Sequence, residues 1–144
     1  MTPLGAKIRE LRIKRDVSLK EMAAALSVSS AYLSALEHGK RGKPTWFLVQ
    51  RIITYFNVIW DEAEEIQRLA ELSDPRVTID TAGMDPKATE LANQLALKIG
   101  GLSEESLAAL LHQLRVAAVK QPGTGAGGLP ATLPAPGPRD AAGT

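Results

Sequence analysis

The stretch that decides the fold is SLKEMAAALSVSSAYLSALE, residues 18–37. It opens with a capping box, because the side chain of Ser18 can cap a helix start while Glu21, three residues later, returns to the Ser18 amide. Apolar residues follow at helical spacing. The pattern predicts a helix that runs to about Leu26 with its apolar side chains turned inward.

A short connection, Ser27-Val28, leads to a second helix over about 30–37. Ser29 is a favourable N-cap for it, and Leu33 and Leu36 are spaced to face inward. A helix, a two-residue turn and a helix make up the spacing of a helix-turn-helix motif. Because Ser29 caps the second helix, we expect its first amides and positive dipole end to point outward.

Helical periodicity continues on both sides of this motif. Apolar spacing predicts a helix over Leu4 to Arg15 and two later helices, over about 46–56 and 61–72. Gly39 suits the residue just past a helix end, where φ is positive, and a basic loop, 40–44, follows it. We expect the helix over 46–56 to turn five side chains inward: Trp46, Val49, Ile52, Ile53 and Phe56.

The second half of the chain predicts a separate pair of helices. Within a linker over 73–85, residues 76–80 fit either a short strand or an extended segment, and Asp85-Pro86 is a good helix start. Two helices with apolar stripes follow, and two short helices bury little alone. The stripes therefore mediate dimerisation, bind another protein or complete one globule within the chain. The predicted boundaries are 1–72 for a DNA-binding domain, 73–85 for the linker, 86–119 for the helical hairpin and 120–144 for a disordered Pro/Gly/Ala-rich tail.

Composition narrows the classes of protein that remain. Residues 1–60 hold ten Lys and Arg against four acids, whereas residues 61–121 hold six against eleven. A basic first half favours a polyanionic partner. The chain has no Cys, which excludes disulfides and Cys-based metal sites, and its N-terminus does not resemble a signal peptide. Sparse strand-favouring residues indicate an all-α fold, and without a membrane-spanning run we expect a cytoplasmic protein.

These residues, taken in register, resemble the lambda-repressor/Cro-like, or XRE-type, helix-turn-helix family over about Leu4 to Val58. The resemblance is carried by Ile8, Leu11-Arg12, Ser18, Leu19, Ala23, Leu26, Val28, Ser29, the run Tyr32 to Glu37, Gly39, Pro44 and Ile52. It implies a five-helix DNA-binding domain that works as a dimer on an inverted repeat of double-stranded DNA. The chain departs from the family at Ser27, where members often have Gly. If φ is positive there, a serine is less favourable than glycine.

The resemblance also implies roles for individual residues. The candidates for base contacts in the major groove are Ser29, Ser30, Ala31, Ser34 and Ala35, although Ser29 could act only as a cap and Ala31 only as a helix former. The candidates for phosphate contacts are Lys20, Tyr32, Lys40, Arg41, Lys43 and Thr45, although Tyr32 could serve the core alone. By analogy with relatives, Arg12 on the first helix is expected to pair with Glu37. The exposed helix face lacks the Arg, Asn or Gln that read G or A most sharply, so affinity should come mostly from phosphates.

Three functions fit these observations. The first is a bacterial or phage-type transcriptional regulator, and repression is favoured because the second helix offers Lys20 and Ala24 rather than acids next to the motif. The second is an antitoxin that regulates its own operon and holds a toxin through residues 86–119. The third is a protein-interaction adaptor that no longer binds DNA. No catalytic or metal-binding motif is recognisable, so we expect neither an enzyme nor a cofactor or metal.

Overall fold

The structure, a computed structural model, describes residues 1–120 and divides them into two compact units, Met1–Ile79 and the unit that begins at Asp80. All regular elements among these residues are helices, which confirms the predicted fold class. Residues 76–80 form an extended linker rather than a strand. Of the tail predicted over 120–144, only Lys120 falls within the described residues.

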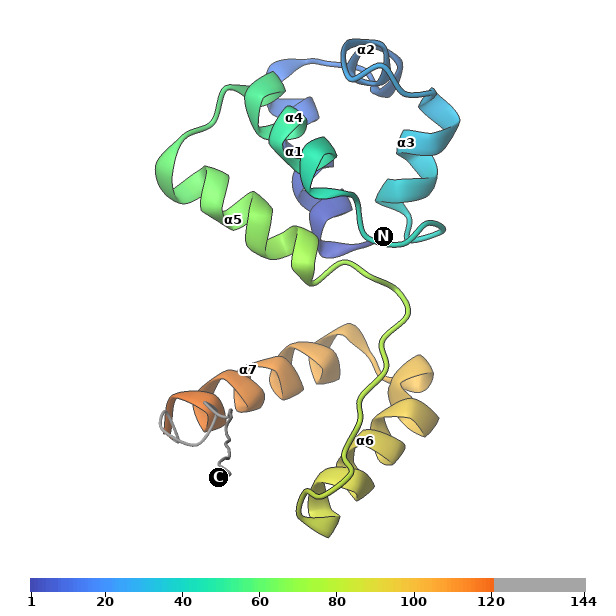
Figure 1. The fold of residues 1–144 in the computed structure, drawn as a ribbon, viewed down its shortest axis with the longest axis vertical. Helices are drawn as coiled ribbons and strands as arrows, with labels where there is room; N and C mark the ends of the chain where they lie inside the picture. The colour runs from blue at the N-terminus through green and yellow to red at the C-terminus, as the bar shows by residue number, and fades with distance from the viewer. Residues whose placement is uncertain (121–144) are drawn as a thin grey trace, which may run out of the picture. The chain divides into compact units, whose positions relative to one another are not determined.

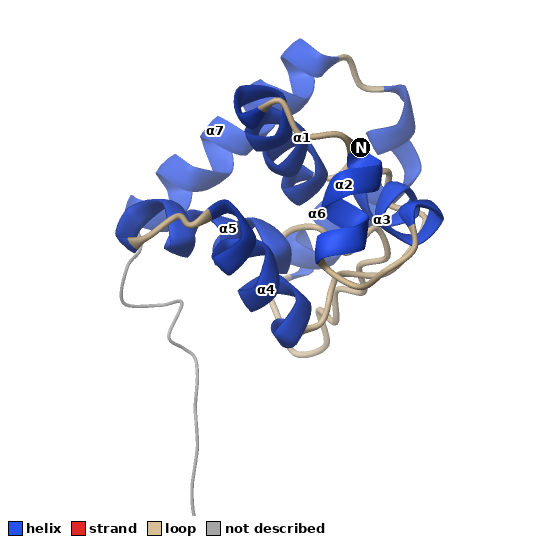
Figure 2. Ribbon diagram, turned by 90° about the horizontal axis from the view of Figure 1, so that it is seen from above, coloured by secondary structure: helices blue, strands red, loops and turns tan. Residues whose placement is uncertain are grey.

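The N-terminal unit contains five helices, as expected (Figure 1). They are α1 (Pro3–Arg15), α2 (Leu19–Ala25), α3 (Ser30–Glu37), α4 (Trp46–Phe56) and α5 (Trp60–Glu71). The helix-turn-helix is formed by α2 and α3, which pack on each other, and α1 contacts both α3 and α5. Figure 2 shows the same helices from above, with loops joining one to the next.

Local capping explains why these helices begin where they do. The Ser18 hydroxyl accepts the Glu21 N–H at 3.0 Å while the Glu21 carboxylate accepts the Ser18 N–H at 2.9 Å, so the predicted capping box is confirmed. Between α2 and α3, Ser27 has φ +60°, the left-handed conformation that favours glycine. Gly39 has φ +77° just after α3, as its place in the sequence predicts.

One hydrophobic core lies between α1, α2, α3, α4 and α5. The side chains that α4 contributes to it differ from the prediction. The buried apolar side chains are Leu4, Ile8, Leu11, Met22, Ala23, Leu26, Leu33, Leu36, Leu48, Val49, Ile52, Phe56, Val58, Ile66 and Ala70. The expected burial of Trp46 is wrong, because its side chain is 66% exposed, and Leu48 is buried in α4 instead. At about 100° per residue, Trp46 lies roughly 110° from the middle of the buried arc of α4.

Close contacts tie the start of α1 to the end of α3 and to the residue Ser73 after α5. A Cβ added to Gly5 would lie 2.2 Å from the backbone oxygen of Glu37, so only glycine lets α1 approach the end of α3 this closely. The Thr2 N–H also donates to the Glu37 carbonyl, at 3.0 Å. After α5, the buried Ser73 hydroxyl accepts the Leu4 N–H at 2.9 Å and donates to a carbonyl of α5.

An ion cluster joins α1 to α5. The Lys7 ammonium lies 3.3 Å from a carboxylate oxygen of both Glu62 and Glu65, and 3.9 Å from Glu10. Burial of Lys7 by itself lowers its pKa, but hydrogen bonds to Glu62 and Glu65 and the nearby negative charges outweigh that effect. The net result is a pKa of Lys7 raised above its ordinary value of 10.5.

The second unit consists of α6 (Pro86–Lys98), the short 3₁₀ helix η1 (Ile99–Gly101) and α7 (Glu104–Lys120). Asp85 and Ser103 cap the two α-helices, each accepting a backbone N–H from the first turn. α6 packs on η1, and α6 and α7 lead away from this turn in different directions (Figure 1). Within residues 1–120, no helix combines the length and the apolar character that crossing a membrane requires.

Candidate nucleic-acid interface

The start of α3 offers a small, polar surface. Ser30 and Ala31 are exposed, Ser34 and Ala35 are half-buried, and the four lie on one side of the helix because they are spaced i, i+1, i+4 and i+5. The opposite side of α3 buries Leu33 and other core residues. The candidate base contacts therefore share a surface that a second molecule can reach.

Ser29 serves as the N-cap of α3. Its hydroxyl oxygen accepts the Tyr32 N–H at 3.0 Å. A serine hydroxyl that accepts one hydrogen bond can still donate its own proton, so the capping role leaves one donor at the exposed helix start. Tyr32 itself is half-buried and packs against the core, which is the structural role that its position also allowed.

The other end of α3 is fixed to α1 by an ion pair. Arg12 Nε donates to Glu37 Oε2 and Arg12 Nη2 donates to Glu37 Oε1, both at 3.3 Å. The Glu37 side chain is only 2% exposed. This burial removes Glu37 from the set of residues that could read a base, and the bidentate pair fixes the direction of α3.

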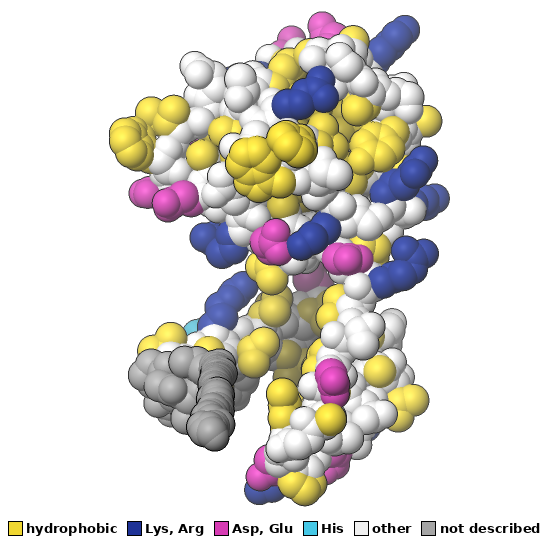
Figure 3. Space-filling model, viewed as in Figure 1, with side chains coloured by type: hydrophobic (Ala, Val, Ile, Leu, Met, Phe, Trp, Pro, Cys, Tyr) yellow, Lys and Arg dark blue, Asp and Glu magenta, His cyan; other side chains and the backbone are white. Residues whose placement is uncertain are grey.

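Exposed cations lie at the start of α2 and in the loop after α3. Lys20, at the start of α2, and Lys40 and Arg41, in the loop after α3, are exposed. Figure 3 shows Lys and Arg side chains projecting from the edge of this unit near α3 and that loop. The Arg41 guanidinium lies 5.2 Å from the centre of the Tyr32 ring, a cation–π distance that holds its charge beside α3.

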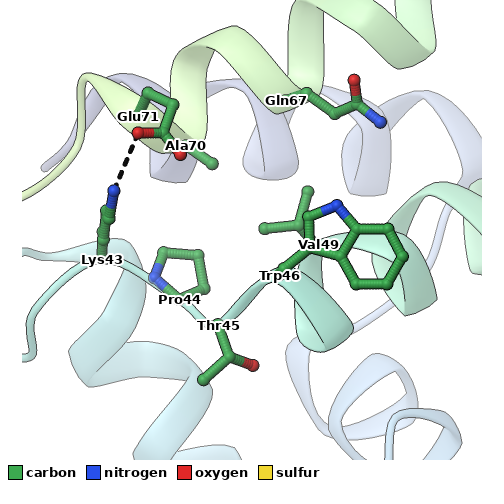
Figure 4. A pocket seen from close by; sticks show the side chains of 8 residues that line it. All are labelled: Lys43, Pro44, Thr45, Trp46, Val49, Gln67, Ala70 and Glu71. Atoms are coloured by element: carbon green, nitrogen blue, oxygen red, sulfur yellow. Dashed lines mark hydrogen bonds and ion pairs between the residues drawn. The ribbon is translucent and has the colours of Figure 1, made fainter.

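Lys43 is placed differently from the other loop cations. Its ammonium lies 2.8 Å from a carboxylate oxygen of Glu71 on α5, and both side chains are exposed (Figure 4). This pair closes one side of an open hollow of about 580 Å³, which Trp46 and Gln67 help to line. Because exposed ion pairs contribute little to stability, Lys43 remains available to exchange Glu71 for a phosphate.

The start of α4 adds features that the sequence did not predict. The Thr45 hydroxyl caps α4 by accepting the Leu48 N–H at 3.2 Å. Trp46 and Phe47 are exposed and pack edge to face, with ring centres 5.4 Å apart. Phe47 also lines an open hollow of about 390 Å³ together with Ser29 and Tyr32 of the α3 start. Phe47 lies off the buried arc of α4, but the sequence alone does not fix that arc, so no sequence signal identified this exposed pair.

Another unpredicted contact joins α2 to α4. A terminal nitrogen of Arg51 donates a hydrogen bond to the Leu26 carbonyl, which is at the end of α2 and has no partner within that helix. Arg51 is thereby held in the structure of the unit. Among residues 1–120, no group of three or more His, Cys, Asp or Glu is arranged to hold a metal ion.

This geometry defines a helix-turn-helix unit with an exposed second helix. Residues 3–72 match the model of a family described as a helix-turn-helix domain. The match confirms the class predicted from the sequence. Helix-turn-helix domains are DNA-binding modules, so the match indicates DNA binding rather than catalysis by this segment.

Two known proteins resemble parts of the chain. An uncharacterized HTH-type transcriptional regulator of Bacillus subtilis (strain 168), RghRB, is 33% identical over 61 residues, which cover 42% of this chain and 44% of that protein. A chain of the SinR protein/SinI protein complex aligns with a TM-score of 0.38 and 18% identity, covering 81% of this chain and 98% of that chain. The chain thus matches less than half the length of the Bacillus regulator.

Proposed function

We propose that this protein is a DNA-binding transcriptional regulator that represses by binding an inverted-repeat operator as a dimer. The observation that carries the proposal is the start of α3, where Ser30 and Ala31 are exposed and the Arg41 guanidinium lies against Tyr32. A recognition helix enters the major groove with its N-terminal residues against base edges. The helix-turn-helix family of residues 3–72 and the name of the Bacillus relative support the same function.

In this proposal, phosphates supply affinity and a few small side chains supply specificity. Ser30 can donate or accept a hydrogen bond, and the Ala31 methyl can meet a thymine methyl. Neither makes the bidentate contact that discriminates most strongly between bases. Binding should therefore depend strongly on salt, and part of the sequence preference should come from DNA shape.

Repression is the simpler outcome for this surface. A dimer on a promoter blocks polymerase without making any further contact. The exposed positions of α2 include Lys20 and Ala24, and its exposed acid, Glu21, is engaged in the capping box with the Ser18 N–H, so α2 offers no acidic patch for polymerase. We infer that such a regulator is a bacterial or phage protein that acts in the cytoplasm.

Selection of bound fragments from a genomic library by the purified full-length protein tests this proposal. An enriched inverted repeat with half-sites about one helical turn apart is the expected result. Flat recovery that disappears as salt rises would leave only counterion-driven, non-specific binding. Absence of any salt-sensitive binding would instead favour the adaptor function.

Variants at the interface test the roles of its parts. Arg41→Ala should weaken binding to all sequences and reduce the salt slope by about one, whereas Ser30→Ala should change base preference. Arg68→Ala, which removes the same charge from exposed α5, is the matched control and should leave both properties unchanged. If Arg41→Ala and Ser30→Ala both bind a selected operator like the parent, the assignment of α3 to the major groove is wrong.

An antitoxin is the second candidate, because α6 and α7 leave apolar side chains exposed, among them Leu91, Leu97 and Leu114. Such a surface suits a protein that folds against a toxin while residues 1–72 bind the operator. Co-purification with a second small protein encoded beside the gene, and loss of that partner after truncation at residue 85, would favour this function over a homodimeric repressor.

A further inference from the structure

The apolar stripe of α7 has little cover within its own unit. In residues 80–119, no side chain is fully buried. Leu110, Leu111 and Leu114 are 46%, 51% and 63% exposed. At about 100° per residue, these side chains and Leu107 occupy a single stripe roughly 100° wide. An apolar stripe of this width on a helix normally faces another helix.

The four leucines are arranged symmetrically along α7. Successive spacings are three, one and three residues, so the stripe reads the same in both directions from a midpoint between Leu110 and Leu111. We propose that α7 pairs antiparallel with α7 of a second copy of this chain, with a two-fold axis at this midpoint. Leu107 then faces the partner's Leu114, and Leu110 faces the partner's Leu111. Such self-complementarity is what an isologous interface requires.

Charge placement favours the antiparallel arrangement. Glu104 and Arg115 lie on the same flank of the stripe, roughly 70–90° from its centre. They are about 16 Å apart along one helix, too far to pair within it. An antiparallel pair joins like flanks, and Glu104 then lies within about 3 Å, along the axis, of the partner's Arg115. A parallel pair joins opposite flanks, and the other flank offers only Ser106, Gln113 and Ala117.

This inference rests on the proposed function for its purpose, because a two-fold pair of chains matches a two-fold operator. The pairing itself is measured without DNA. A dimer paired through α7 that binds no DNA would contradict the proposed function alone. A protein that binds its operator as a dimer, but gives no cross-link between Leu107→Cys and Leu114→Cys, would contradict this inference alone.

Cysteine cross-linking of the full chain tests the direction and register, since the natural sequence contains no Cys. Leu107→Cys and Leu114→Cys are made separately and then mixed under oxidising conditions. The mixture should give disulfide-linked dimers, but neither variant alone should, because identical positions are about 10 Å apart along the axis and disulfides need Cα atoms within about 7 Å. Efficient cross-linking of each variant with itself would establish a parallel pair and overturn the proposal.

Sedimentation equilibrium of the full chain supplies the second test. Leu111→Glu should weaken dimerisation at least tenfold, and Val119→Glu, which changes an exposed residue outside the stripe, should not. Arg115→Glu should also weaken the dimer, and adding Glu104→Arg should restore it. A parent protein that stays monomeric at about 100 μM, or a charge reversal that restores nothing, would overturn the proposal.

Discussion

Removal of Arg12 should strongly destabilise the interface between α1 and α3. In Arg12→Met, the Glu37 carboxylate keeps its buried position and loses two hydrogen bonds from the guanidinium. Leaving one member of a buried ion pair unpaired costs about 3–5 kcal/mol. A domain of this size is stable by only about 5–10 kcal/mol, so the variant should lose a large part of its free energy of unfolding.

The second half of the test replaces both partners. Arg12→Met combined with Glu37→Leu removes the charge together with its need for a partner, and such replacements are often neutral. The double variant should therefore recover most of the stability lost in Arg12→Met. Urea denaturation followed by the methyl NMR signals of the buried core reports on this unit, and Arg9→Met, at an exposed position of α1, is the control. A loss below about 1 kcal/mol in Arg12→Met, or no recovery in the double variant, would refute this reasoning.

Three further changes give measurable shifts in the same urea assay. Ser27→Gly should raise the free energy of unfolding by about 0.5–1 kcal/mol, because the gain from removing the strain of positive φ exceeds the loss from the more flexible unfolded chain. Ser27→Ala keeps that strain and should not raise the free energy of unfolding. Ser73→Ala should lower it by about 1–3 kcal/mol, since the Leu4 N–H loses its buried acceptor; equal stability would mean that another group accepts this N–H. The raised pKa of Lys7 means that its ion pairs contribute fully below its unfolded pKa and are lost as pH rises through the higher folded value. The stability lost between about pH 9 and about pH 11 should therefore be smaller in Lys7→Met than in the parent or in the exposed control Lys14→Met.

Local signals account for what the sequence predicted well. Caps such as Ser18 and Ser29 act within three residues, so the helix starts could be read directly from the chain. The orientation of Trp46 could not, because five apolar residues in seven, from Trp46 to Ile52, allow more than one inward arc. Packing within the unit, including that of α4 on α5, selects the arc that contains Leu48.

Contacts between residues far apart in the sequence could not be predicted for a different reason. Lys43 and Glu71 are 28 residues apart, and no periodicity relates them. The closeness of Gly5 to the end of α3 likewise depends on how two helices cross. The candidate DNA contacts come from the resemblance to a family, and their assignment to bases or phosphates stays a prediction that the Arg41 and Ser30 variants test.

The ties on α3 separate its stability from its proposed function. The C-terminal end of α3 is held at Glu37. The Glu37 carboxylate pairs with Arg12, the Glu37 carbonyl accepts the Thr2 N–H, and the Glu37 backbone lies against Gly5. At the other end of α3, about 10 Å away along the helix, Ser30 and Ala31 are exposed. Substitutions at the held end should therefore change unfolding first and DNA binding only as a consequence. Substitutions at the exposed end can change base preference while leaving the core intact, so this helix can acquire a new operator without a new fold.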